Sequence, residues 1–232
     1  MDVLLFQRIA SVVALTAALL EGSMDAAMPD KDVDSTVFLV NREHKISEDY
    51  IPEVRKTNVY GMSQSMRSDA AAALEEMFKA AKDESKISLA TVSGYRSYSK
   101  QSTIYSRKKK TLGSVDKADA LVALPGASEH QLGMAMDVAQ RGSSQLNSGF
   151  GKTKGGKWVS ENAHRFGFIV RYPLGQEEIT GYAYEPWHVR YLGKEYAKAI
   201  YQAGVPMEVF ISAHRLEIYE FLIHAVEDEV LP

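Results

Sequence analysis

Residues Ser128–Ala139 read SEHQLGMAMDVA, and residues Tyr184–Tyr191 read YEPWHVRY. Within the first stretch, GMAMDVA alternates small and apolar residues around one aspartate, as a buried strand does. Asp137 is therefore expected on a strand that otherwise faces the core, where an unpaired carboxylate is costly. A divalent cation or an arginine is the usual partner, so the sequence predicts a positive charge beside this acid.

Histidines on both stretches supply further donors for a metal ion. A hydrolytic zinc ion takes three protein ligands from His nitrogen and Asp or Glu oxygen, and it keeps its fourth position for water. His130, Asp137 and His188 would fill the three places, and Gly133 allows a tight turn that brings His130 back toward the strand. We therefore expect one zinc ion at these residues, in a chain that has no cysteine.

A glutamate lies three residues before the second histidine. Pro186 disfavours helical geometry at Glu185, so Glu185 and His188 are expected at the entrance of a strand. We interpret Glu185 as the general base, which takes a proton from water and returns it to the leaving amine. Tyr184 and Trp187 would limit hydration of this carboxylate and raise its pKa toward the working pH.

Each of these residues has a simpler interpretation when it is taken alone. A single histidine such as His130 or His188 is more often a satisfied core or surface residue, and Asp137 could belong to a buried salt bridge. The spacing is not a general metal motif, because the chain lacks HExxH. The zinc site is favoured because all of these residues occur together in two stretches of this composition.

Four segments resemble the bacterial zinc D-alanyl-D-alanine carboxypeptidases of the vancomycin-resistance type, in the LAS peptidase family. The two stretches above are similar to the family's SxHxxGxAxD and ExWH motifs. SGYRSYSKQ at Ser93–Gln101 is similar to its SGYRSxxxQ segment, and FLVNREHKISEDYIP at Phe38–Pro52 to its usual opening segment. The resemblance runs from about Phe38 to about Phe210, and the tail beyond has no match in the family.

The resemblance implies a fold and a set of chemical roles. The fold is α+β, a small and mostly antiparallel sheet flanked by helices, which is the zinc D-Ala-D-Ala peptidase (Hedgehog-like) fold. His130, Asp137 and His188 match the zinc ligands, and Glu185 matches the catalytic base. Arg96 would direct its guanidinium at the scissile carbonyl and stabilise the oxyanion, a task suited to a fixed cation with several donors.

Other matched residues are expected to contact the substrate. Gln101 and Ser128 match positions that help to hold the peptide end, and Tyr184 and Trp187 are further candidate contacts. The alternative for Gln101 is a solvated helix position, and the alternative for Arg96 is a structural ion pair.

The implied substrate is the peptidoglycan stem peptide, and the expected reaction is attack of zinc-activated water on the D-Ala-D-Ala amide, with release of D-alanine. Recognition of a terminal carboxylate needs a cation or several donors beside a small pocket. Alternatives on the same zinc site are an L,D-carboxypeptidase, a D,D-dipeptidase and an endopeptidase. A non-catalytic peptidoglycan-binding module is the alternative from another class, but a structural zinc site usually has four ligands and needs no base.

A serine carboxypeptidase of the penicillin-binding type would act on the same substrate. Ser97–Lys100 reads SYSK and fits its SxxK motif, while Ser160–Asn162 reads SEN and fits SxN. Both are short patterns that occur by chance, and no KTG follows Asn162. The sequence therefore favours the metal hydrolase.

Length and charge limit the number of domains and the kinds of partner that we expect. The chain has 232 residues, 45% of them hydrophobic, which suffices for one domain with a sizeable core. The formal net charge of −3 gives no general attraction to nucleic acid, and no nucleic-acid partner is expected. The basic run Arg107–Lys110 is interpreted as a solvated helix end, with contact to anionic wall polymers as the alternative.

The chain is expected to divide into a leader at residues 1–28, a linker at 29–37, a peptidase domain at 38–213 and a C-terminal helical extension at 214–232. The leader contains the apolar block IASVVALTAALL at Ile9–Leu20, which has signal-peptide length and is short for a membrane span. We expect an export signal or a short anchor, membrane contact through this segment, and an extracytoplasmic location.

Periodicity and turn residues predict the elements within the domain. Helices are expected at Ser65–Lys82, Lys100–Lys109, Lys157–Arg165 and from Gly193 to about Ala203, and strands at Ile87–Val92 and in FGFIVRYP before Pro173. In the tail from Pro206, an apolar stripe at helical spacing predicts one or two helices that pack on the core.

Overall fold

The computed structural model describes residues 32–119 and 121–215, and residues 39–207 form one compact unit. Of the second unit, residues 32–38 are mostly turns and residues 208–215 are helical. The predicted leader at 1–28 lies outside the described residues, as does most of the predicted C-terminal extension. The proposed division at 38–213 stays a prediction.

The compact unit alternates short strands with helices. Its strands are β1 (Arg55–Lys56), β2 (Ser65–Met66), β3 (Leu89–Ser93), β4 (Ala135–Gln140), β5 (Phe168–Tyr172) and β6 (Glu185–Tyr191). Its α-helices are α3 (Ser68–Ser85), α4 (Tyr98–Leu112), α5 (Val115–Asp119), α6 (Lys154–Asn162), α7 (Glu177–Thr180) and α8 (Lys194–Ala203). Three 3-10 helices join them: η1 (Glu129–Leu132), η2 (Ser148–Lys152) and η3 (Ala163–Phe166).

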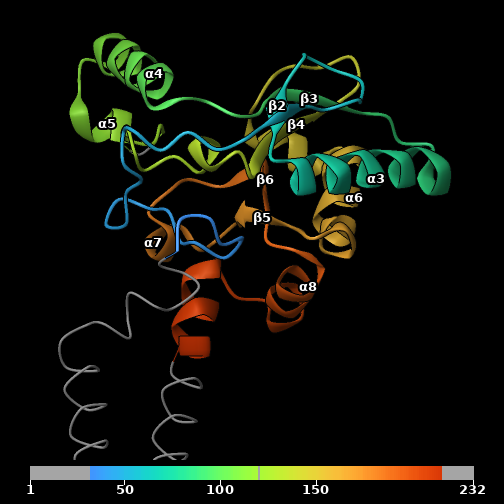
Figure 1. Ribbon diagram of the computed structural model, residues 1–232. Coiled ribbons are helices and arrows are strands. Elements are labelled where there is room, and N and C mark those ends of the chain that lie inside the picture. The colour runs from blue at the N-terminus through green and yellow to red at the C-terminus, as the bar shows by residue number, and fades with distance from the viewer. Residues whose placement is uncertain (1–31, 120, 216–232) are drawn as a thin grey trace, which may run out of the picture. The chain divides into compact units, whose positions relative to one another are not determined.

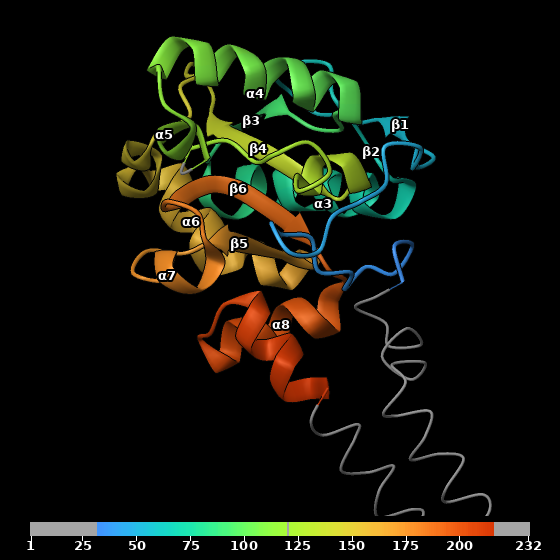
Figure 2. The same ribbon diagram turned by 90° about the vertical axis from the view of Figure 1, so that its left-hand side faces the viewer.

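An antiparallel sheet forms the centre of this unit. Among the described residues, four strands pair in the order β3-β4-β6-β5, and β1 and β2 form a separate two-stranded ribbon. Figure 2 shows the four strands stacked in that order, with α4 on the viewer's side and α3 behind. This arrangement confirms the predicted α+β fold with a mostly antiparallel sheet.

One face of the sheet packs against α3 and α6, which lie together on the right-hand side of Figure 1. Strand side chains alternate between faces, so every second residue of each strand enters this core. The core contains Leu74, Met77 and Phe78 of α3, Trp158 and Val159 of α6, Met136 and Val138 of β4, Phe168 of β5 and Val189 of β6.

The other face of the same sheet is buried but polar. Asp137 lies between the core residues Met136 and Val138 along β4, so its side chain points to the opposite side. The same alternation places His188 and Arg190 of β6 and Arg171 of β5 there, and all four residues are buried. The alternation of side chains along the strands therefore places these charged groups together on one face of the sheet.

Local sequence explains most of the element boundaries. Helix α3 was expected from Ser65, but Ser65 and Met66 instead pair with β1, and the helix begins at Ser68. Strand β5 ends immediately before Pro173, which has no backbone N–H to continue the ladder. Helix α8 begins after Gly193, as the sequence predicted.

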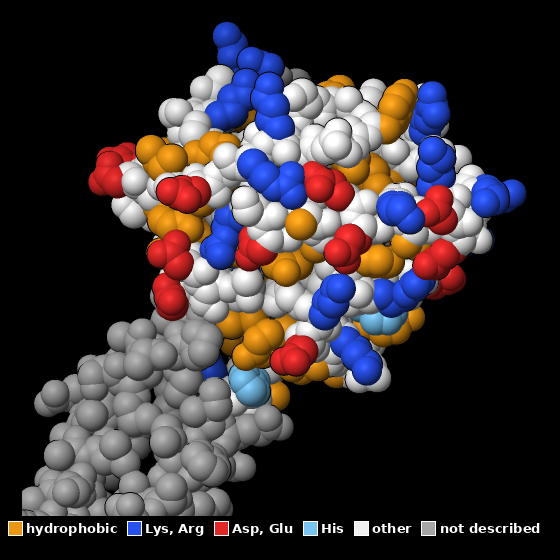
Figure 3. Space-filling view, turned by 45° about the vertical axis from the view of Figure 1, so that its right-hand side comes forward, with side chains coloured by type: hydrophobic (Ala, Val, Ile, Leu, Met, Phe, Trp, Pro, Cys, Tyr) orange, Lys and Arg blue, Asp and Glu red, His pale blue; other side chains and the backbone are white. Residues whose placement is uncertain are grey.

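The surface of the protein mixes charges of both signs. Figure 3 shows Lys and Arg side chains among Asp and Glu side chains on one face, with a group of basic side chains at the top. The run Arg107–Lys110 lies in the second half of α4, where cations interact favourably with the helix dipole. Within residues 32–119 and 121–215, no helix is both long and apolar enough to cross a membrane.

Candidate active site

Three buried side chains from separate elements meet on the polar face of the sheet. Asp137 of β4 and His188 of β6 are direct partners in the antiparallel register, so their side chains leave the sheet side by side. His130 arrives from η1, which ends at Gly133 with a left-handed φ of 70°. A Cβ at Gly133 would lie 2.9 Å from Val54 Cγ1, so glycine suits both the turn and the space.

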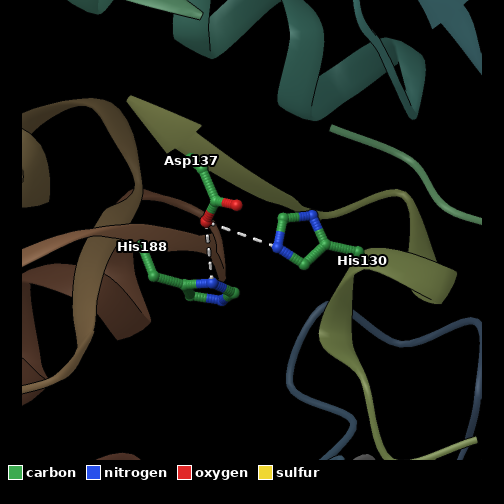
Figure 4. Close-up of side chains that lie close together, drawn as sticks. All are labelled: His130, Asp137 and His188. Atoms are coloured by element: carbon green, nitrogen blue, oxygen red, sulfur yellow. Dashed lines mark ion pairs between the residues drawn. The ribbon is translucent and has the colours of Figure 1, made fainter. Parts of the chain in front are cut away.

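The three side chains point at a common centre. Asp137 Oδ1 lies 3.4 Å from His130 Nε2 and 3.2 Å from His188 Nδ1. Figure 4 shows both imidazole rings directed at this one carboxylate oxygen. One donor atom from each residue lies within 4.8 Å of the others, so the group could hold a metal ion.

The remaining hydrogen bonds support metal binding. His130 Nε2 and Asp137 Oδ1 are buried without a hydrogen-bond partner among the described residues, although such atoms are normally satisfied. The other ring nitrogen, His130 Nδ1, lies 2.7 Å from the carbonyl oxygen of Gly94, so the proton is placed there and the Nε2 lone pair is free. Two imidazole nitrogens and one carboxylate oxygen are a donor set that suits zinc.

Burial and neighbouring charges set the protonation of these groups. Burial, together with the positive charge of Arg96, lowers the pKa of His130 to about 4, so its imidazole is neutral at pH 7. Burial also lowers the pKa of His188, but the neighbouring carboxylates of Asp137 and Glu129 outweigh this effect and raise it to about 9. Burial acts to raise the pKa of Asp137, but the two histidines outweigh it, and the carboxyl is ionised.

The candidate base is the first residue of β6. Glu185 Oε2 lies 3.8 Å from His188 Nδ1, on the same side of that ring as Asp137, and 19% of the Glu185 side chain is exposed. Burial raises the pKa of Glu185 to about 7, although the charge of His188 opposes this. A carboxylate with such a pKa can both accept and donate a proton near neutral pH.

These groups open into a cavity of about 220 Å³. The cavity is lined by His130, Asp137 and His188, together with Arg96, Gln101, Ser128, Glu129, Glu185 and Trp187. Apolar walls are supplied by Ile104, Leu121, Val122 and Leu146. Tyr184 is not among the lining side chains, and its hydroxyl lies beside Gly151 of η2, so substrate contact by Tyr184 stays a prediction.

Two polar side chains of the cavity wall have atoms that could form further hydrogen bonds. Burial lowers the pKa of the Arg96 guanidinium, and Arg96 Nε has no hydrogen-bond partner among the described residues. Gln101 is buried rather than solvated: its Nε2 donates to the carbonyl of Ala123 at 2.6 Å, whereas its Oε1 is unpaired in the described part of the chain. These atoms can therefore bond a ligand, although the roles predicted for them stay predictions.

Sequence reasoning missed a buried charged group at the wall of the same cavity. Glu129 is 1% exposed and lies beside His188, with its Oε2 3.1 Å from His188 Nε2. Arg171 Nε donates to Glu129 Oε1 at 2.7 Å, and Arg190 Nη1 donates to the same oxygen at 2.9 Å. A possible signal was the strand pattern itself, which places Arg171 and Arg190 on the face of Asp137.

The residues of the serine-enzyme motifs are not brought together. Ser97 is the N-cap of α4, and its hydroxyl accepts from the backbone N–H of Lys100. Ser160 lies in α6, which packs on the apolar face of the sheet, whereas α4 lies toward the other side in Figure 2. The two serine motifs therefore do not form a common site.

Comparisons with known proteins agree with this geometry. Residues 63–194 match the VanY family, described as D-alanyl-D-alanine carboxypeptidase. A D-alanyl-D-alanine carboxypeptidase of Enterococcus faecalis (strain ATCC 700802 / V583) is 36% identical over 191 residues, which cover 78% of this chain and 67% of that protein.

Two solved structures extend the likeness to three dimensions. The LD-carboxypeptidase LdcB superposes with a TM-score of 0.74 and 41% identity, over 78% of this chain and 88% of that one. A mutant of the vancomycin-resistance D,D-pentapeptidase VanY from a VanB-type cassette, in complex with Zn(II), gives a TM-score of 0.66 and 34% identity, over 76% of this chain and 98% of that one.

Proposed function

Because this chain belongs to the VanY family of D-alanyl-D-alanine carboxypeptidases, we propose that it is a zinc-dependent D,D-carboxypeptidase that removes the terminal D-alanine from peptidoglycan stem peptides. The observation that carries this proposal is the convergence of two imidazole nitrogens and one carboxylate oxygen on a single point beside Glu185. A closed structural zinc site would have a fourth protein ligand there and would not need a carboxylate with a raised pKa.

The side chains divide the chemistry between them. His130, Asp137 and His188 would hold the ion, and zinc, when bound, acidifies water and polarises the scissile carbonyl. Glu185 takes a proton from the attacking water and delivers it to the amine nitrogen as the amide bond breaks. Its pKa of about 7 suits both transfers.

The cavity wall orients the peptide. The guanidinium of Arg96 is a partly desolvated cation at the cavity wall, so it is suited to the negative charge that develops on the carbonyl oxygen. Gln101 and Ser128 are buried polar groups of the same wall, suited to hold the peptide end. The small, partly apolar cavity is of a size suited to a terminal alanine.

An L,D-carboxypeptidase is the second candidate, because the likeness to LdcB, named as an LD-carboxypeptidase, covers 78% of the chain at 41% identity. Both activities release the terminal D-residue, and they differ in the configuration of the residue before it. Since the substrate belongs to the cell wall, we propose an extracytoplasmic site of action in either case.

The deciding experiment is incubation of the purified protein with pentapeptide, tetrapeptide and D-Ala-D-Ala, with zinc or with a chelator, followed by mass analysis of the products. Zinc-dependent release of D-alanine from the pentapeptide supports the D,D activity. Release from the tetrapeptide alone would replace it with the L,D activity, and cleavage of the dipeptide alone would indicate a dipeptidase. Hydrolysis that persists with chelator, or labelling by a β-lactam, would contradict the zinc mechanism.

A further inference from the structure

Glu129 is buried beside His188 and borders the cavity, and it is not one of the three predicted metal ligands. The side chains of Glu129, Arg171 and Arg190, named here the Glu129 cluster, are all 0% exposed. Burying a lone carboxylate costs several kcal/mol, so this acid is tolerable only because two guanidinium groups accompany it.

The two oxygens of Glu129 have different partners. Oε1 accepts from Arg171 Nε at 2.7 Å and from Arg190 Nη1 at 2.9 Å, while Oε2 lies 3.1 Å from His188 Nε2. Two arginine hydrogen bonds therefore hold Oε1, and Oε2 lies beside the imidazole. Because an ionised carboxylate only accepts, the proton of this hydrogen bond must lie on His188 Nε2.

The position of this proton determines which ring nitrogen has a lone pair for a metal ion. His188 Nδ1 lies 3.2 Å from Asp137 Oδ1 and 3.8 Å from Glu185 Oε2, on the side of the cavity. With the proton held at Nε2, a neutral His188 presents the Nδ1 lone pair to a metal ion. Glu129 itself faces the opposite edge of the ring, so it does not act as a ligand.

The two histidines are anchored in different ways. His130 Nδ1 is paired with the neutral carbonyl of Gly94, whereas His188 Nε2 is paired with a carboxylate. A charged acceptor makes the stronger hydrogen bond and increases the basicity of the ligating nitrogen. The two guanidinium groups on Oε1 favour the ionised form of this acceptor.

We propose that Glu129, fixed by Arg171 and Arg190, is a positioning residue that sets the tautomer and orientation of His188 for zinc binding. This inference rests on the proposed zinc-dependent function, but it concerns how the chain prepares the ligand rather than which peptide is cut. Removal of such an outer partner typically lowers metal affinity 10–100-fold.

Glu129→Gln is the informative variant, because its amide has nearly the same shape and no charge. Its NH₂ group can donate to His188 Nε2, which would move the imidazole proton to Nδ1, the nitrogen that must bind zinc. We expect about 10–100-fold weaker zinc binding by chelator competition. Nitrogen NMR of the zinc-loaded wild-type protein should show His188 protonated at Nε2, and His130 protonated at Nδ1 in both proteins.

Matched variants separate positioning from folding. Glu84→Gln makes the same change in an exposed pair with Arg165, and it should leave zinc affinity unchanged. Glu129→Asp keeps the charge between the arginines but shortens the side chain, so it should fold and still bind zinc more weakly. If Glu129→Gln does not fold, Glu129→Asp and the wild-type NMR spectrum decide the question.

Several results would overturn the inference. It fails if His188 Nε2 is unprotonated in the zinc-loaded protein, or if folded Glu129 variants bind zinc as tightly as the wild-type protein. Failure of the proposed function looks different: wild-type protein that binds zinc but cleaves no peptide contradicts the function and leaves the role of Glu129 measurable. Wild-type protein that binds no zinc contradicts both.

Discussion

At the scale of single residues, Glu185 and His188 are adjacent in the cavity, but we expect their substitution to affect zinc binding and turnover differently. Glu185→Gln should keep zinc and lower kcat by about 10²–10⁴-fold, because the amide cannot take a proton from water. His188→Ala should lose both zinc and turnover, since it removes a ligand. Metal analysis of the purified variants and D-alanine release would measure the two effects. Full activity of Glu185→Gln would exclude it as the base.

Arg96 tests whether a delocalised cation is needed at the cavity wall. Arg96→Lys keeps the charge but loses the guanidinium fork, so we expect kcat to fall by about 10²-fold with zinc content unchanged. Arg107→Lys makes the same change on the exposed part of α4 and should have no effect. Steady-state kinetics on the preferred peptide compare the two, and equal rates for Arg96→Lys and wild type would favour a purely structural ion pair.

The approach of His130, Asp137 and His188 to one another was predicted from the sequence, whereas the position of Glu129 was not. His130, Asp137 and His188 stand in stretches whose composition and family resemblance both indicate zinc, and the structure brings them within reach of one ion. Glu129 is next to His130 in sequence, but its partners Arg171 and Arg190 come from two later strands. Such a contact depends on strand register, which composition and spacing do not give.

At the scale of elements, the helices and strands followed from periodicity, while the first residues of α4 and α6 depended on N-cap side chains that periodicity does not mark. The expected helix at Lys100–Lys109 begins at Tyr98, because Ser97 caps it. The expected helix at Lys157–Arg165 is divided into α6 and η3, and it begins at Lys154 after the N-cap Thr153. The apolar stripe predicted from Leu216 onward lies outside the described residues.

The start of α6 offers a test of close packing. A Cβ at Gly156 would overlap the backbone carbonyl of Phe150, whereas a Cβ at Gly155 would lie 3.3 Å from the side chains of Gln140 and Leu89. Backbone cannot move aside as a side chain can, so Gly156→Ala should cost about 3 kcal/mol or more of unfolding free energy and Gly155→Ala clearly less. Urea unfolding of the two neighbouring variants measures this difference, and equal stability would contradict the packing described here.

The contact of β1 with α3 predicts a pH-dependent stability. Glu75 accepts from both terminal nitrogens of Arg55 and from the backbone N–H of Asn58, and these bonds lower its pKa. Because the pKa of Glu75 is lower in the folded state than in the unfolded state, its ionised carboxylate stabilises the fold at pH values above the unfolded-state pKa. This stabilisation is lost as the pH falls through the folded-state pKa. Glu75→Gln should therefore cost about 1 kcal/mol at pH 7, since the pair is partly exposed, and almost nothing in strong acid.

Urea unfolding of the wild-type protein and of Glu75→Gln, at neutral and at acid pH, would show whether the two curves converge. Lys79 and Asp83 form an exposed ion pair on the same helix, so Asp83→Asn is a suitable control and should change stability less. A constant difference between wild type and Glu75→Gln at all pH values would mean that the charge of Glu75 is not involved.

At the scale of the whole molecule, the site is contained in one compact unit. The family match at residues 63–194 lies inside the unit at 39–207, and every residue that lines the cavity belongs to that unit. The proposed leader, linker and C-terminal extension lie largely outside it. We therefore expect them to affect where the enzyme acts rather than how it cleaves, and this division stays a proposal.

The metal should also link the site to global stability. Its ligands come from η1, β4 and β6, which meet only in the folded chain, so the unfolded chain offers zinc no comparable site. Free zinc at a hundred times its dissociation constant stabilises the fold by about 2.7 kcal/mol. For a chain of this size, that raises the Tm by about 5–11 °C. Thermal unfolding with zinc and with a chelator measures the shift, which Glu185→Gln should keep and His188→Ala should lose. A wild-type Tm that does not respond to zinc would contradict metal binding at these three residues.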